Sequence, residues 1–120
     1  MKIYRLENYK GLGPFSASQN MVKYLISHND PETMLESVGL SAEEFQRVTD
    51  FGLLFGWSTR EFMKNFFRNP EKAIKKASDM KMKISVYEED NYFLFEDGQV
   101  MFLKTTEPIE RISLRDFLSA

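Results

Sequence analysis

The residues best suited to chemistry lie near the start of the chain, where Arg5 and Glu7 precede a loop that reads Gly11-Leu-Gly13-Pro14-Phe15. Closely spaced glycines let backbone amides approach an anion, and an arginine can hold a phosphate through two parallel hydrogen bonds. The same residues fit a structural role, in which the glycines form a turn and Arg5 pairs with Glu7 or another acid. Because the spacing is not that of a phosphate-binding loop, the structural role is favoured over an anion site.

Two further places could hold a ligand. Ser58 and Thr59 stand at the expected start of a helix, where hydroxyl groups and free amides can bind a ligand oxygen. However, Ser58-Thr-Arg-Glu61 also has the pattern of a capping box, which explains these residues without a ligand. Glu96 and Gln99 flank a tight turn, where a carboxylate could orient a sugar hydroxyl or act as a base. Their ordinary role is to form the solvent-facing end of a hairpin.

The composition excludes several kinds of site. The 120-residue chain has no cysteine, which rules out a disulfide framework and a thiolate zinc site. The single histidine, His28, is too few for a multi-histidine metal site or the usual histidine-dependent triads. The net charge is −2 with acids and bases mixed along the chain, so no nucleic-acid footprint is expected. No apolar run is long enough to span a membrane and no signal peptide is recognisable, which predicts a cytoplasmic protein.

The clearest structural pattern is the segment Tyr92–Leu103, in which an Asp-Gly pair at 97–98 separates two apolar, aromatic runs. Asp-Gly is typical of a two-residue type I′ turn, because both central residues of that turn need a positive φ. Such a turn places Phe95 opposite Val100. Both faces of this hairpin would then be apolar, so we expect it in the covered middle of a sheet.

The rest of the pattern indicates which elements position these residues. Alternation predicts a first strand over Lys2–Glu7, and Phe51–Trp57 is interpreted as a buried strand or connector. Caps and apolar spacing predict short helices that begin near Ser18, Asp30, Ser41, Ser58 and Asn69. About four antiparallel strands follow from Lys83 onward, built on the hairpin, with a short helical turn capped by Ser113 at the end. One strand, several helices and then a run of strands predicts a single α+β domain over residues 1–120.

Three blocks of the chain resemble a family of small, uncharacterised bacteriophage and prophage proteins. Tyr4-Arg5-Leu6-Glu7 followed by Gly11-Leu-Gly13-Pro14-Phe15 is similar to that family's opening, Tyr-Arg-x-Glu and then Gly-x-Gly-Pro-aromatic. Phe55–Phe67 resembles its Gly-aromatic-Ser segment and aromatic-ending helix. Val86–Glu88 with Gly98–Phe102 resembles its closing strands, whereas Met21–Asp50 departs from it. The resemblance implies a phage-encoded protein and brings no established activity.

A weaker likeness is to ADP-ribosyltransferase-like folds, because Arg5, Ser58 and Glu96 follow the order of that fold's functional blocks. The likeness implies NAD as the ligand, with Arg5 at its phosphates, Ser58 supporting the site and Glu96 holding the ribose. Gln99 departs from the pattern, since it stands where an aligned strand would carry the catalytic glutamate. A pocket that binds a nucleotide without transferase activity fits this departure better than an enzyme does.

The leading hypothesis is therefore a phage-encoded accessory protein that acts by binding a host or anti-phage defence protein as a modulator or inhibitor. It needs no catalytic residue, metal or cofactor, and its partner is neither nucleic acid nor membrane. Two alternatives stay open: an ADP-ribosyltransferase-like domain that binds or processes NAD or another nucleotide, and a virion or assembly component. Ligand binding, if present, is expected at Arg5, Glu7, Gly11, Gly13 and Gln99. Arg5 is expected to be partly buried and hydrogen-bonded, with the loop 11–15 folded over the sheet.

Overall fold

The computed structural model describes residues 1–13, 39, 41, 43, 44, 47, 52–67, 69–96 and 98–119. The helices expected to begin near Ser18 and Asp30 lie outside these residues. The capping box expected at Ser41 is confirmed. The Ser41 hydroxyl accepts a hydrogen bond from the Glu44 N–H at 3.1 Å, and the Glu44 carboxylate accepts one from the Ser41 N–H at 3.4 Å. This reciprocal pair satisfies two backbone donors at a helix start.

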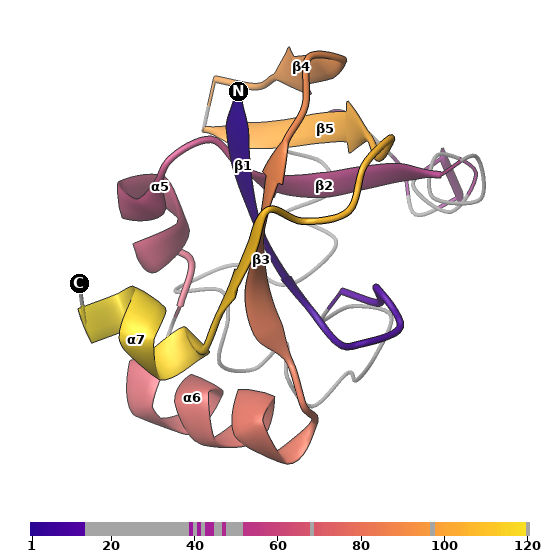
Figure 1. Cartoon of the computed structure of the whole chain (residues 1–120). Coiled ribbons are helices and arrows are strands. Elements are labelled where there is room, and N and C mark those ends of the chain that lie inside the picture. The colour runs from indigo at the N-terminus through magenta and orange to yellow at the C-terminus, as the bar shows by residue number, and fades with distance from the viewer. Residues whose placement is uncertain are drawn as a thin grey trace.

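Six antiparallel strands form the sheet of the described chain, in the order β4-β5-β2-β1-β3-β6 (Figure 1). They are β1 (Lys2–Glu7), β2 (Leu53–Trp57), β3 (Lys83–Glu88), β4 (Tyr92–Leu94), β5 (Gln99–Leu103) and β6 (Glu110–Ile112). The first strand of the chain lies inside the sheet and pairs along its whole length with β3. The predicted α+β class is confirmed. The sheet is larger than the four late strands expected, because β1 and β2 both join it.

Three helices lie on one side of this sheet in the described chain: α5 (Arg60–Lys64), α6 (Pro70–Asp79) and α7 (Leu114–Ser119) (Figure 1). Each begins after a residue whose side chain accepts a hydrogen bond from a free N–H of the first turn. These residues are Thr59, Asn69 and Ser113. Pro70 at the first position of α6 confirms the predicted start, because proline lacks the N–H that would be unpaired there.

The two faces of the sheet carry separate clusters of buried apolar side chains. On the helix side, Leu6 and Ile84 pack with residues of the helices and of the connections on either side of α6: Met63, Phe67, Ala73, Ala77, Met82, Leu114 and Phe117. On the other side a smaller cluster joins β1, β3 and β5 through Ile3, Tyr87, Val100 and Phe102. Because side chains alternate along a strand, each of the central strands contributes to both clusters.

Close contact between β1 and β2 depends on Gly56. A Cβ atom at this position would lie 2.6 Å from the Ile3 Cγ2 atom and 2.8 Å from the Tyr4 carbonyl oxygen. Both distances are shorter than van der Waals contact, so any larger residue would push the strands apart. The glycine that made Phe51–Trp57 ambiguous in sequence is therefore what lets this segment join the sheet as β2.

The predicted register of the hairpin is wrong by one residue. In the structure Leu94 pairs with Val100, Phe93 with Met101 and Tyr92 with Phe102. The Phe95 N–H donates to the Gln99 carbonyl at 2.9 Å, so three residues, 96–98, separate the closing pair instead of two. Gly98 has a φ of +89°, as the last residue of a three-residue loop requires. Asp97 lies outside the described residues. A one-residue shift exchanges the two faces of a strand, and Phe95 and Val100 are therefore not partners.

The predicted position of the hairpin in the sheet is correct for β5, which is internal and largely buried, but wrong for β4. The two outer strands of the described sheet are β4 and β6, and the middle is formed by β2 and β1. All three side chains of β4 are exposed, whereas those of β1 and β3 are largely buried. An apolar pattern on both faces was interpreted as a covered strand, but here it belongs to an uncovered edge.

Candidate functional site

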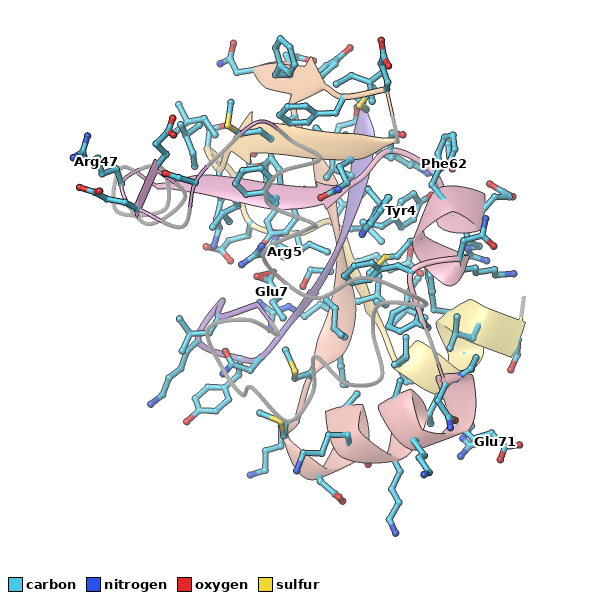
Figure 2. All side chains as sticks on the ribbon, turned by 180° about the vertical axis from the view of Figure 1, so that it is seen from behind. Tyr4, Arg5, Glu7, Arg47, Phe62 and Glu71 are labelled. Carbon is cyan, nitrogen blue, oxygen red and sulfur yellow. The ribbon has the colours of Figure 1, made fainter. Side chains whose placement is uncertain are left out.

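Arg5 lies in β1 beside Glu7 (Figure 2), and each of its three side-chain nitrogen atoms donates a hydrogen bond within the protein. Its Nε atom donates to the Glu7 carboxylate at 3.3 Å, Nη1 donates to the Phe55 carbonyl at 2.9 Å and Nη2 donates to the Gly11 carbonyl at 3.2 Å. Its side chain is 12% exposed. The prediction that Arg5 is at least partly buried and hydrogen-bonded is therefore confirmed, and the guanidinium joins β1 to β2 and to the following loop.

Glu7 completes this group from two positions further along β1 (Figure 2). Its carboxylate accepts from Arg5 and, through Oε1, from the buried Tyr87 hydroxyl of β3. Burial raises the pKa of Tyr87, and the hydrogen bond to Glu7 raises it further, so the phenol stays protonated. Burial lowers the pKa of Arg5 and the Glu7 charge opposes that effect, but an arginine keeps its proton in proteins. The result is a charged pair with its hydrogen bonds satisfied inside the fold.

The loop after β1 folds back onto this group. The Asn8 side chain accepts from the Lys10 N–H at 2.9 Å and the Leu12 N–H at 3.0 Å, which closes a tight turn. Gly13 lies against the guanidinium, since a Cβ atom there would be 3.1 Å from the Arg5 Nη2 atom. Pro14 and Phe15 lie outside the described residues. Arg5, Glu7, Gly11 and Gly13 are thus brought together as the sequence suggested, and the described contacts bind them to one another.

The capping box predicted at Ser58-Thr-Arg-Glu61 begins one residue too early. Thr59, and not Ser58, caps α5, because its hydroxyl accepts from the Phe62 N–H at 3.1 Å. The Ser58 hydroxyl donates to the Gly98 carbonyl at 2.9 Å, and the Ser58 N–H donates to the same oxygen at 2.9 Å. Ser58 therefore ties the end of β2 to the hairpin turn.

The remaining candidates, Glu96 and Gln99, lie on either side of that turn. Glu96 is exposed, whereas Gln99 is buried in β5 opposite Trp57. Within the described ranges, hydrogen bonds link Ser58 to the turn and Arg5 to its own loop, but none joins Arg5 to Ser58 or Glu96. The side chains proposed for NAD thus belong to two separate hydrogen-bonded groups.

A different feature distinguishes the surface of the molecule, namely a group of exposed apolar side chains on β4 and the adjoining end of β5. Exposed fractions are 44% for Tyr92, 58% for Phe93, 49% for Leu94 and 39% for Leu103. We call these four residues the aromatic edge. The Phe93 ring packs edge-on against Phe95 at a centroid distance of 4.9 Å, which restricts its orientation.

The backbone of the aromatic edge is open as well. The Leu103 N–H donates to the Asn91 carbonyl at 3.3 Å, and the Phe95 N–H donates to the Gln99 carbonyl at 2.9 Å. Because hydrogen-bonded positions alternate along an antiparallel strand, the N–H and C=O groups of Tyr92 and Leu94 point away from β5. No described strand lies on that side of β4. The sequence did contain the signal for this surface, an apolar run on both faces, but not its position in the sheet.

Comparison with known proteins gives one family. A family model described as "Bacteriophage T4 Y00F protein" matches residues 1–115. No curated protein and no solved structure matches the chain. In the part of the chain that the structure describes, no helix is both long and apolar enough to cross a membrane.

Proposed function

Because this chain belongs to the bacteriophage T4 Y00F protein family, we propose that it is a phage-encoded accessory protein that acts by binding another protein through its aromatic edge. The observation that carries the proposal is the exposure of Tyr92, Phe93 and Leu94 on an outer strand. Large aromatic side chains are enriched at the centres of protein interfaces and supply much of their binding energy. An outer strand with three exposed apolar side chains invites pairing with another chain unless a partner covers it.

The geometry favours addition of a partner strand to β4. The outward N–H and C=O groups of Tyr92 and Leu94 can pair with an extended segment of the partner, as in other sheet-extending complexes. Tyr92 and Leu94 would then contact one face of the added strand, and Phe93 would contact the other. Main-chain pairing would supply affinity, and these side chains would supply selectivity for an apolar partner segment.

We further propose that the partner is a host or anti-phage defence protein, whose activity the phage protein modulates or inhibits. A role in the virion or its assembly is the competing possibility, because the aromatic edge could equally bind another phage protein. The hydrogen bonds of Arg5 favour protein binding over nucleotide processing, since three of its five side-chain N–H groups are already bonded to Glu7, Phe55 and Gly11.

The test compares the partners that four tagged proteins, the wild type and three variants, capture from infected and uninfected host lysates. Leu94→Pro removes one outward N–H without removing a β4–β5 hydrogen bond, and Phe93→Lys places a charge at the centre of the aromatic edge. The matched control is Tyr9→Lys, because Tyr9 is 68% exposed but lies in the loop after β1. We expect a partner retained by the wild type and by Tyr9→Lys to be lost from both edge variants, with unchanged melting temperatures.

Equal capture by all of these proteins would contradict the role of the aromatic edge. Capture only from infected lysate, together with detection of the protein in purified particles, would install the virion alternative. Dimerisation of the purified wild type that is abolished by Leu94→Pro would instead assign the edge to a second copy of this chain.

A further inference from the structure

A second surface feature lies near the opposite edge of the sheet from β4, where β3 and β6 pair. It is an open cleft of about 1070 Å3 between the end of β1, the α6–β3 connection and the β6–α7 connection. The volume is at the upper end of the range for sites that hold small molecules. Neither the hydrogen bonds of Arg5 nor the aromatic edge accounts for this cleft, and a ligand bound in it would be independent of the proposed function.

The cleft is rich in positive charge. Among the described residues that line it, five are cationic: Lys75, Lys81, Lys83, Arg111 and Arg115. Two are acidic, Glu7 and Asp79, which leaves an excess of three positive charges in a chain whose net charge is −2. The Glu7 carboxylate already pairs with Arg5, so it does little to neutralise the cleft. Cations lining a concave surface concentrate field lines and attract anions.

These cations are available for a ligand. Within the described ranges, the ion pairs involve the amino terminus, Arg5, Arg47 and Lys104, and none of them uses a cation of the cleft. Lys81, Lys83, Arg111 and Arg115 are all exposed. Like charges that line one cleft repel one another, and an anion bound between them would relieve that repulsion.

The backbone at Lys81 gives an independent indication. Lys81 follows the last turn of α6, where its N–H donates to the Ser78 carbonyl at 3.1 Å and the Met82 N–H donates to the Ala77 carbonyl at 2.8 Å. This hydrogen-bond pattern requires a left-handed residue at the position of Lys81, and glycine is preferred there. Lys81 has a φ of +57°, the one positive φ of a residue other than glycine in the described chain. A strained lysine in place of the favoured glycine points to a use for its ammonium group.

The uncharged residues that line the cleft suit a ligand that also has an uncharged part. The hydroxyl groups of Ser78 and Ser113 lie at the cleft and can donate hydrogen bonds, while the exposed Tyr9 ring and the half-buried Ile74 side chain provide apolar surface. From this combination we propose that the cleft binds a small phosphorylated molecule with an apolar body, of the size of a nucleotide. The phosphates contact the lysines and arginines, and the body packs on the apolar floor.

The test is calorimetric titration of the whole protein with ADP, inorganic pyrophosphate and adenosine. We expect ADP to bind more tightly than pyrophosphate and adenosine not to bind, because the cations recognise phosphate and the floor adds affinity. Lys81→Gly should weaken ADP binding about tenfold while leaving the melting temperature equal or higher, since glycine relieves the strained backbone. Arg111→Gln should also weaken it, whereas Lys72→Gln is the matched control on the exposed side of α6, outside the cleft.

Four results would overturn the proposal: no binding of either phosphate compound, equal binding by Lys81→Gly and the wild type, equal loss in Lys72→Gln, or tighter binding of a short oligonucleotide than of ADP. Equal affinity for pyrophosphate and ADP would overturn the proposed binding of an apolar body, because it would show that the cleft recognises phosphate alone. Because Lys81→Gly removes charge without destabilising the helix end, loss of binding in this variant cannot be attributed to unfolding.

Discussion

At the scale of single residues, Glu89 shows how one carboxylate can hold two connections together. It follows β3 and accepts hydrogen bonds from the N–H and hydroxyl groups of both Thr105 and Thr106, at 2.7 to 3.2 Å. Its own N–H donates to the Met1 carbonyl at 3.1 Å. The segment after β5 is thereby fixed to the turn after β3 and to the start of β1.

This arrangement predicts a specific dependence of stability on pH. Burial raises the pKa of Glu89, but the hydrogen bonds from Thr105 and Thr106 outweigh burial, so its pKa in the folded state lies below the ordinary value. A carboxyl group with a lowered folded pKa stabilises the protein fully above the unfolded pKa of about 4.3, and this stabilisation is lost as the pH falls through the folded value. We expect Glu89→Gln to lower the free energy of unfolding by about 1–3 kcal/mol at pH 7 and by progressively less below pH of about 4.

Urea unfolding of both proteins between pH 2 and pH 7 measures this difference. The control is Asp90→Asn, which changes a neighbouring exposed carboxylate that no described hydrogen bond involves. A constant difference between wild type and Glu89→Gln at all pH values would contradict the assignment, because it would mean that the protonation of Glu89 is not linked to folding.

At the scale of elements, the hairpin turn and α5 are packed together through Gly98. Figure 2 shows Phe62 on α5, and a Cβ atom added to Gly98 would overlap its ring. The Gly98 carbonyl also receives both hydrogen bonds from Ser58. The position therefore requires glycine for two reasons: a positive φ of 89° and the absence of a side chain beneath Phe62.

Substitutions at Gly98 can measure the backbone and steric contributions separately. We expect Gly98→Ala and Gly98→Val each to lower the free energy of unfolding by more than about 1 kcal/mol, because residues with a Cβ atom are strained at this φ. In a Phe62→Ala background the steric part disappears and only the backbone part stays, so the cost of Gly98→Ala should be smaller there. Thermal unfolding of the four proteins of this cycle measures both parts. An unchanged melting curve for Gly98→Val would mean that the turn is formed elsewhere.

The same elements show what a local pattern can and cannot predict. The helix starts at Asn69-Pro70 and Ser113 were predicted correctly, because in each case the capping side chain has no adjacent residue that could cap the helix in its place. Ser58 and Thr59 are adjacent hydroxyl residues that can both cap a helix, and the choice depends on the hydrogen bond from Ser58 to the distant Gly98. Likewise Asp-Gly predicts a turn, but the difference between a two-residue and a three-residue loop reverses the faces of β4.

At the scale of the whole molecule, sequence alone predicted the class of the fold but not its surfaces. The aromatic edge exists because β4 is an outer strand, and that depends on β2 and β1 inserting next to β5 and β3. The cationic cleft brings Arg111 and Arg115 beside lysines about thirty residues earlier, so no local charge run marks it. Arg5 and Glu7 were recognised as a pair because they are two residues apart on one strand, where side chains share a face.

The order of strands predicts how the molecule opens. In the described sheet β1 has a partner on each side and buried side chains on both faces, whereas β4 has one described partner and three exposed side chains. Amide protons of Ile3–Leu6 and Ile84–Tyr87 should therefore exchange with solvent most slowly, and those of β4 should exchange at least about tenfold faster.

Within β4 the exchange should alternate. The amides of Phe93 and Phe95 point toward β5 and should be partly protected, whereas those of Tyr92 and Leu94 point outward and should exchange at nearly the rate of an unfolded chain. Hydrogen exchange followed residue by residue by NMR measures this. A two-residue Asp-Gly turn would invert the pattern, because it would bond Tyr92 and Leu94 to β5 and free Phe93. Protection of Tyr92 and Leu94 would therefore contradict the register, and with it the open backbone that the proposed partner strand needs.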